Sequence, residues 1–115
     1  MSSYHVPVRD HGGTGVNQDE FKKFLKSAGC RLAVVEFSAK WCGACKKICP
    51  LVQEMTLQYQ NVMFANVDVD ESQDLAQTYN IRAIPTFQMF KRAKKIFEFY
   101  GADAKKLEMK IKELM

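Results

Sequence analysis

Residues 34 to 50 read VVEFSAKWCGACKKICP, and two features of this stretch decide how the rest of the sequence is interpreted. The surrounding apolar run, LAVVEFS at residues 32–38, is typical of a strand buried on both faces, yet Glu36 interrupts it. Cys42 and Cys45 follow, with two residues between them. Together these features indicate a buried carboxylate placed to move a proton for a reactive thiol.

Composition limits the class of protein. The 115 residues fit one domain spanning 1–115, in which residues 1–16 form either a displaced edge strand, at YHVPV, or a loose tail. The net charge of +4 is smaller than nucleic-acid-binding or membrane-surface proteins usually carry. No apolar stretch suits a signal peptide or a membrane span. We therefore expect a cytoplasmic location, with the nucleus as the alternative, and no nucleic-acid or membrane partner.

Periodicity predicts an α/β fold with a central mixed sheet of four to five strands flanked by four helices. The helical segments are residues 17–28, about 41–59 with Leu51 on the apolar stripe, a short stretch capped by Asp70 or Ser72, and the end of the chain. The strands are residues 32–38, 62–69, 86–91 and 95–100, the last two forming an antiparallel hairpin. Sites in such sheets form at the carboxyl ends of strands.

The cysteine pair falls at such a place, at the start of the second helix. Residues three apart on a helix share a face, so the pair can form a disulfide, and a helix N-terminus stabilises a thiolate. We expect Cys42, at the exposed end, to be the nucleophile and the less exposed Cys45 to resolve the mixed disulfide. The weaker alternatives are two inert core thiols or part of a four-ligand zinc site. Further zinc ligands could come only from Cys30, Cys49, His5 and His11, and the two extra cysteines are interpreted as incidental.

Three segments resemble the thioredoxin family: FSAKWCGACK at residues 37–46, IPTFQMFK at 84–91 and FEFYGADAKKLE at 97–108. The match runs in register from about residue 20 to residue 115 and is most similar to vertebrate cytosolic thioredoxins and their testis-type branch. The resemblance implies a thioredoxin fold and a thiol–disulfide oxidoreductase that reduces protein disulfides. It implies that Cys42 attacks the substrate disulfide and that Cys45 then releases the reduced substrate.

The resemblance also implies the other parts of the site. Pro85 would be a cis proline facing the cysteines. A groove for an extended substrate segment would be lined by Trp41, Gly43, Ala44, Ile84, Pro85, Gly101 and Ala102. No bound cofactor or metal is implied, because electrons would come from NADPH through thioredoxin reductase. The implied partners are that reductase and disulfide-containing proteins, and the implied state is a monomer, with a disulfide-linked dimer as the alternative.

Glu36 stands where thioredoxins carry a buried Asp that takes part in proton transfer with the resolving cysteine. Burial raises the pKa of a carboxyl group, which suits proton exchange with a thiol near neutral pH. Glu36 is therefore interpreted as a catalytic residue. The alternative is a structural Glu whose carboxylate bonds a polar neighbour such as Asn66 on the next strand.

Four features depart from the family pattern. Ala44 replaces a usual Pro and predicts a weaker reductant, and Glu in place of Asp at position 36 adds a methylene in a packed place. Ala93 replaces a Gly of the hairpin turn, and the strand expected before residue 20 is poorly patterned. These departures leave a second functional class open, a redox-impaired thioredoxin-like binding or chaperone module.

Overall fold

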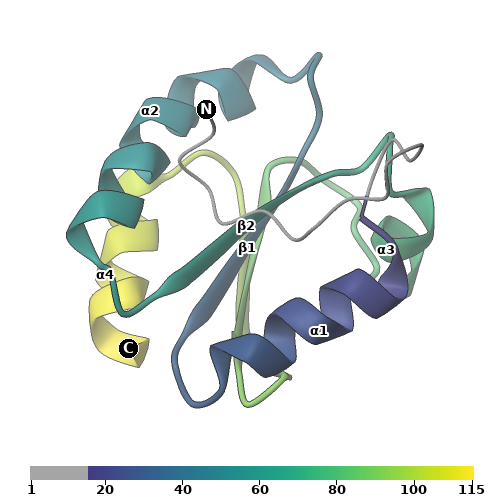
Figure 1. Ribbon diagram of the computed structural model, residues 1–115. Helices are drawn as coiled ribbons and strands as arrows, with labels where there is room; N and C mark the ends of the chain where they lie inside the picture. Colours follow the sequence, from purple (N-terminus) through teal and green to yellow (C-terminus); the bar gives the residue numbers. More distant parts are fainter. Residues whose placement is uncertain (1–15) are drawn as a thin grey trace.

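The structure of the protein, a computed structural model, describes residues 16–115 (Figure 1). Helices and strands follow in the order expected from the sequence. The helices are α1 (Gln18–Ala28), α2 (Gly43–Gln58), α3 (Gln73–Thr78) and α4 (Ala104–Leu114). The strands are β1 (Ala33–Ser38), β2 (Met63–Asp68), β3 (Thr86–Lys91) and β4 (Lys94–Tyr100). The strand considered at YHVPV lies outside the described residues.

The described strands form one mixed sheet in the order β2-β1-β3-β4. β1 runs parallel to β2 and antiparallel to β3, and β3 and β4 form the predicted antiparallel hairpin. The connection from β1 to β2 is the helix α2, which therefore begins near the carboxyl end of β1. The sheet thus brings the start of α2 to the place where the site was expected.

Side chains of β1 alternate between two apolar layers. Val34 joins the layer formed with α2 and α4, whereas Val35 and Phe37 join the layer formed with α1. Figure 1 shows the same arrangement, with α2 and α4 on one side of the sheet and α1 and α3 on the other. By this alternation, Glu36 and Ser38 belong to the face covered by α2 and α4.

Local sequence signals explain the ends of α1 better than the start of α3. Asn17 and Glu20 form a reciprocal capping box, and Gly29 ends the helix with a φ of +61°. Ser72 is the N-cap residue of α3, but its hydroxyl does not cap the helix. It accepts the N–H of Val16 at 2.8 Å instead, which ties the start of the described chain to α3.

Two details of α2 differ from the sequence prediction. The helix begins at Gly43 rather than Trp41, because Cys42 has an extended backbone and acts as the N-cap. Leu51, expected on the buried stripe, is 46% exposed. It lies about 100° around the helix from Val52, which packs on the sheet. None of the helices between residues 16 and 115 combines the length and the apolar character needed to cross a bilayer.

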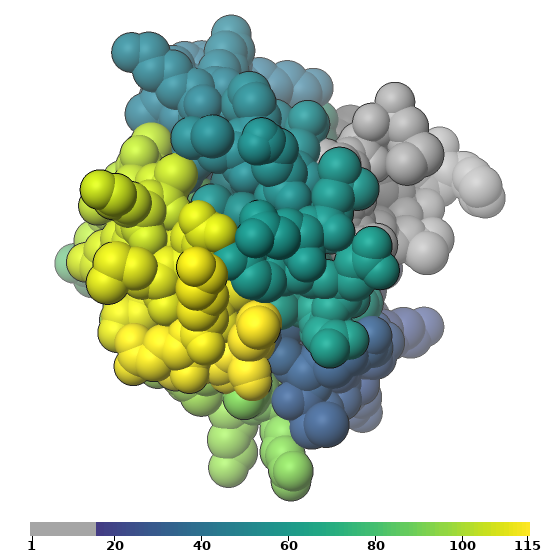
Figure 2. All heavy atoms as spheres, turned by 90° about the vertical axis from the view of Figure 1, so that its left-hand side faces the viewer, coloured from purple at the N-terminus to yellow at the C-terminus, as the bar shows by residue number. Residues whose placement is uncertain are grey.

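The turn between β3 and β4 projects at the bottom of the molecule in Figure 2, below the helices α2 and α4. Its central residues, Arg92 and Ala93, have φ angles of +52° and +65°. Because this region of backbone conformation favours glycine, the departure noted at Ala93 carries a conformational cost. The N–H of Arg92 donates to the carbonyl of Gly29 at 3.2 Å, which fixes the turn against the end of α1.

Candidate active site

The cysteine pair lies at the N-terminus of α2. Cys42 is the N-cap, Cys45 is in the first helical turn, and a disulfide joins them with their Cα atoms 5.3 Å apart. The backbone N–H of Cys45 donates to the sulfur of Cys42 at 3.0 Å, so this sulfur takes the place of the usual N-cap oxygen. The same N–H and the positive end of the helix stabilise a thiolate on Cys42 once the bond is reduced.

The two cysteines do not differ in solvent exposure, although Cys42 was expected to be the more exposed of the two. Each is 6% exposed, and both pack in a small cluster with Ala39, against Val69 and Ile84. Position on the helix separates them instead. The Cys42 sulfur receives a hydrogen bond from the helix terminus, whereas Cys45 lies one turn farther in.

The loop before β3 reaches the cysteine pair. The Ile84–Pro85 peptide bond is cis, as expected, and Ile84 packs against the cysteine cluster. The N–H of Gly101 donates to the carbonyl of Pro85 at 2.9 Å. Gly101 has a φ of +99°, which glycine adopts without strain. These contacts bring three of the predicted groove residues to the cysteine end of the sheet, with the exposed Ala102 beside them.

Trp41 is the most exposed large side chain near the cysteine pair, at 69%, and Gly43 and Ala44 are exposed nearby. Its indole Nε1 donates a 2.8 Å hydrogen bond to Oδ2 of Asp70. From the sequence, Asp70 was expected only as a helix cap, and its bond to Trp41 was not predicted. The available signal was the position of Asp70 just after β2, whose carboxyl end lies beside that of the parallel strand β1.

Glu36 is buried, at 2% exposed, in the middle of the sheet. It lies opposite Asn66 in the β1–β2 pair and opposite Phe87 in the β1–β3 pair. Its face of the sheet is covered by α2, the helix that begins at the cysteines. The position suits both interpretations made from the sequence, a proton acceptor for Cys45 and a partner of Asn66.

The two remaining cysteines differ in their distance from the pair, because Cys49 follows Cys45 by about one turn of α2 and Cys30 lies outside that helix. Cys30 is exposed and precedes β1, at the opposite end of that strand from Cys42. Cys49 is partly buried in α2, where its sulfur accepts the side-chain N–H of Gln53 at 3.5 Å. Within residues 16–115, no group of three His, Cys, Asp or Glu side chains is arranged to hold a metal ion. His5 and His11 lie outside the described residues.

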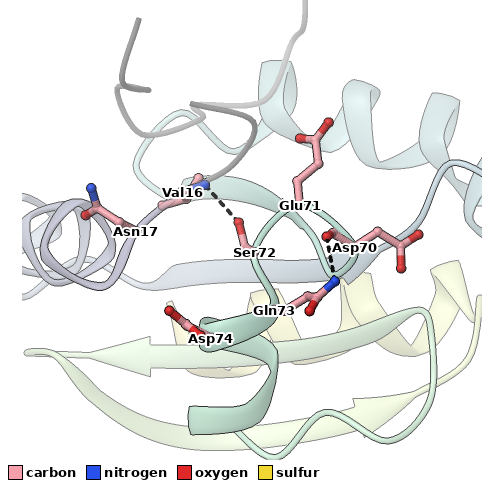
Figure 3. Close-up of a pocket in the computed structure, with 7 residues that line it drawn as sticks. All are labelled: Val16, Asn17, Asp70, Glu71, Ser72, Gln73 and Asp74. Carbon is pink, nitrogen blue, oxygen red and sulfur yellow. Dashed lines mark hydrogen bonds between the residues drawn. The ribbon is translucent and has the colours of Figure 1, made fainter. Parts of the chain in front are cut away.

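A polar cleft of about 410 Å³ lies near the start of α3, close to Asp70 (Figure 3). It is lined by Val16, Asn17, Asp70, Glu71, Ser72, Gln73 and Asp74. Figure 3 shows the three carboxylates pointing in different directions rather than converging on one point. The cleft includes none of the cysteines, and it meets the site through the bond from Trp41 to Asp70 and the ion pair between Lys40 and Glu71.

Comparison with known sequences agrees with this arrangement. A family model described as thioredoxin matches residues 14–113. Thioredoxin domain-containing protein 8 of Rattus norvegicus is 53% identical to this chain, and the match covers 84% of this chain and 93% of that protein. Thioredoxin of Ovis aries is 48% identical over 95 residues, which cover 83% of this chain and 90% of that protein.

Solved structures share the fold. The X-ray structure of Fasciola hepatica thioredoxin matches with a TM-score of 0.85 at 35% identity, covering 87% of this chain and 96% of that one. The germline-specific thioredoxin Deadhead of Drosophila melanogaster matches with a TM-score of 0.80 at 29% identity, covering 89% and 99%. The expected thioredoxin fold is confirmed. By sequence and by structure, this chain belongs to the thioredoxin family.

Proposed function

We propose that this chain is a thioredoxin-type protein-disulfide reductase in which Cys42 and Cys45 alternate between dithiol and disulfide. The observation that carries the proposal is the disulfide at the N-terminus of α2. The thiolate is the form that attacks a disulfide, and the helix terminus together with the Cys45 N–H favours a thiolate on Cys42.

In the first step, the Cys42 thiolate attacks one sulfur of the substrate disulfide. A bond forms between Cys42 and that sulfur, the substrate S–S bond breaks, and the second substrate sulfur leaves as a thiolate that takes a proton from solvent. We assign the groove for the substrate segment to the exposed Trp41, Gly43, Ala44 and Ala102 together with Ile84, Pro85 and Gly101.

In the second step, Cys45 attacks the sulfur of Cys42. The Cys45 thiol gives its proton to the Glu36 carboxylate, the Cys42–Cys45 bond forms, and the bound substrate sulfur leaves as a thiolate and is then protonated. The dithiol has given two electrons to the substrate. Burial of Glu36 supports the proton transfer, because the carboxyl is shielded from solvent on the face of the sheet that α2, the helix of Cys45, covers.

The disulfide must then be reduced for another cycle. We propose that thioredoxin reductase supplies two electrons from NADPH, so that the chain acts in electron transport and cell redox homeostasis without a bound cofactor. We also propose that it works in the cytoplasm, with the nucleus as the alternative. Membership of the thioredoxin family supports these partners.

The test is NADPH consumption with thioredoxin reductase and insulin as the disulfide substrate. The native chain and Cys30→Ser, which changes a cysteine away from the site, should turn over, and Cys42→Ser should not. A parallel thiol count at a fixed glutathione potential shows whether the disulfide forms. A native chain that forms its disulfide but reduces nothing would contradict the reductase and favour the binding or chaperone module.

A further inference from the structure

We propose that Gln88 is a positioning residue for the loop that carries Ile84 and Pro85 to the cysteine pair. Its side-chain amide joins the end of α3 to β3 and so closes the base of this loop, residues 80–85. The inference rests on the proposed function, because it assigns a residue that holds part of the substrate groove in place although it is itself fully buried.

The amide of Gln88 uses its NH₂ group to join three segments of the fold. Nε2 donates to the carbonyl of Tyr79 at 3.1 Å and to Oε2 of Glu98 at 3.0 Å. Tyr79 is the C-cap residue of α3, where backbone carbonyls lack partners within the helix. The first bond therefore ties the last residue before the loop to the strand that follows the loop.

Two other hydrogen bonds hold parts of the same loop. The N–H of Ile81 donates to the carbonyl of Ala76 at 2.8 Å, which fixes the start of the loop on α3. The hydroxyl of Thr86 donates to the carbonyl of Ala83, which fixes the end of the loop on β3. Neither bond joins α3 to β3. The amide of Gln88 makes that connection, and it therefore sets how the two ends of the loop lie relative to each other.

The second bond of the amide connects the loop to β4. Glu98 is paired with Gln88 in the hairpin, and its Oε1 accepts from Nζ of Lys95 at 2.9 Å. Burial raises the pKa of Glu98, but the hydrogen bonds from Lys95 and Gln88 and the charge of Lys95 hold it below its ordinary value. An ionised carboxylate only accepts hydrogen bonds, so Glu98 orients the amide. β4 continues to Gly101, whose N–H holds the carbonyl of Pro85.

The amide occupies an apolar layer at a cost. Gln88 lies on the face of β3 that also carries Phe90, in the layer that contains Tyr79 and α1. Because its NH₂ group is directed at the two acceptors, its Oε1 has no hydrogen-bond partner within residues 16–115. A buried polar atom without a partner destabilises the folded state. An apolar side chain would avoid this cost, so the amide fits a functional role better than a stabilising one.

The first test is hydrogen exchange of backbone amides in the full chain, which requires no turnover. Gln88→Leu removes both hydrogen bonds, and Gln88→Met serves as a second variant if the first does not fold. Either variant should speed exchange of the Ile81 N–H about two- to tenfold, the factor that corresponds to one typical hydrogen bond. Unchanged exchange at Ile81 in the folded variants would overturn the proposal.

The matched control is Met89→Leu. Met89 is the next residue of β3 and is also fully buried, but it packs in the layer of α2 and α4. This substitution places the same residue on the opposite face of the strand and should leave exchange at Ile81 unchanged. An equal acceleration in Met89→Leu would overturn the proposal, because the effect would then report general loosening of the sheet.

Activity gives a second readout, which tests the link from the loop to the groove. Gln88→Leu should raise the KM for insulin about two- to tenfold with kcat unchanged. It should not change the rate with hydroxyethyl disulfide, which is too small to fill the groove. An unchanged KM, or a fall in kcat for both substrates, would overturn the positioning role. Failure of insulin reduction in the native chain would overturn the proposed function, whereas exchange at Ile81 tests the loop anchor on its own.

Discussion

The indole of Trp41 and the carboxylate of Asp70, 29 positions apart in the sequence, are joined by a 2.8 Å hydrogen bond. Trp41 directly precedes Cys42, so the bond orients an exposed ring beside the redox pair. A ring held in place presents a preorganised surface to a substrate segment, which reduces the entropy lost on binding. The neighbours of these two residues in the sequence are linked as well: Lys40, which precedes Trp41, and Glu71, which follows Asp70, form a 3.2 Å ion pair.

Removing the Trp41–Asp70 bond should weaken substrate binding more than chemistry. A typical hydrogen bond contributes about 0.5–1.5 kcal/mol, so Asp70→Ala should raise the KM for insulin about two- to tenfold with little change in kcat. The assay is steady-state insulin reduction. Asp74→Ala, which removes another carboxylate from the same cleft, is the control and should behave like the native chain. If both variants raised the KM equally, the negative charge of the cleft, rather than the hydrogen bond to Trp41, would be what affects substrate binding.

Restoring the family's usual proline at position 44 should make the chain more stable and more strongly reducing. Ala44 lies in the first turn of α2, where N–H groups lack intrahelical partners and proline is well accommodated. Ala44→Pro should raise the free energy of unfolding by about 0.4–1 kcal/mol and lower the reduction potential of the pair. Urea unfolding and a glutathione redox titration measure these effects. An unchanged potential would show that Ala44 does not set the redox poise.

Regular features of the fold and of the site could be predicted because their signals are local. Apolar spacing predicted every helix and strand of the described chain in order, and the interruption at Glu36 predicted a buried carboxyl. The spacing of Cys42 and Cys45 allowed the disulfide that the structure contains. The cis bond before Pro85 was inferred from family resemblance, because proline alone favours the trans form.

The features that were missed depend on partners distant in sequence. Trp41 meets Asp70, and Ser38 meets Asn66, only because β1 and β2 pair in one particular register. Spacing along the chain does not specify such pairs. Asp70 or Ser72 was expected to cap α3. Ser72 is the N-cap, but its hydroxyl accepts the N–H of Val16 instead of capping the helix. Each error arises where a tertiary contact overrides a local preference.

Ala93 is a position where one substitution should stabilise the fold. A left-handed conformation costs a residue with a Cβ about 1–2 kcal/mol, while glycine adds about 0.4–1 kcal/mol of unfolded-chain entropy. With φ of +65° at Ala93, Ala93→Gly should therefore raise the free energy of unfolding by roughly 0.5–1 kcal/mol. Urea unfolding measures the change.

The matched control for Ala93→Gly is the reverse substitution at Gly29. Gly29 has φ of +61° and ψ of −127°, and an added Cβ would meet nothing within 4 Å. Gly29→Ala should therefore destabilise the chain through backbone strain alone, by about 1–3 kcal/mol. If Ala93→Gly also destabilised the chain, the cost assigned to the hairpin turn would be wrong.

Tyr59, the C-cap of α2, links this helix to the middle of α4 through its hydroxyl, which donates a 2.6 Å hydrogen bond to Oε2 of Glu108. The hydrogen bond to Glu108 raises the pKa of Tyr59 above its ordinary value of 10.0, and burial and the negative charge of Glu108 act in the same direction. The folded chain therefore holds the Tyr59 proton more tightly than the unfolded chain.

This difference predicts how stability changes in alkali. The contribution of Tyr59 is fully present below pH 10, where folded and unfolded chains both carry the proton, and it is lost as pH rises through the higher pKa of the folded state. Tyr59→Phe should be less stable than the native chain at pH 7, and its stability should fall less steeply above pH 10. Urea unfolding at a series of pH values measures both effects. Tyr100→Phe, which changes a tyrosine that is 57% exposed, is the control and should keep the native slope. If the stability of Tyr59→Phe fell as steeply above pH 10 as that of the native chain, another group would be responsible for the loss of stability in alkali.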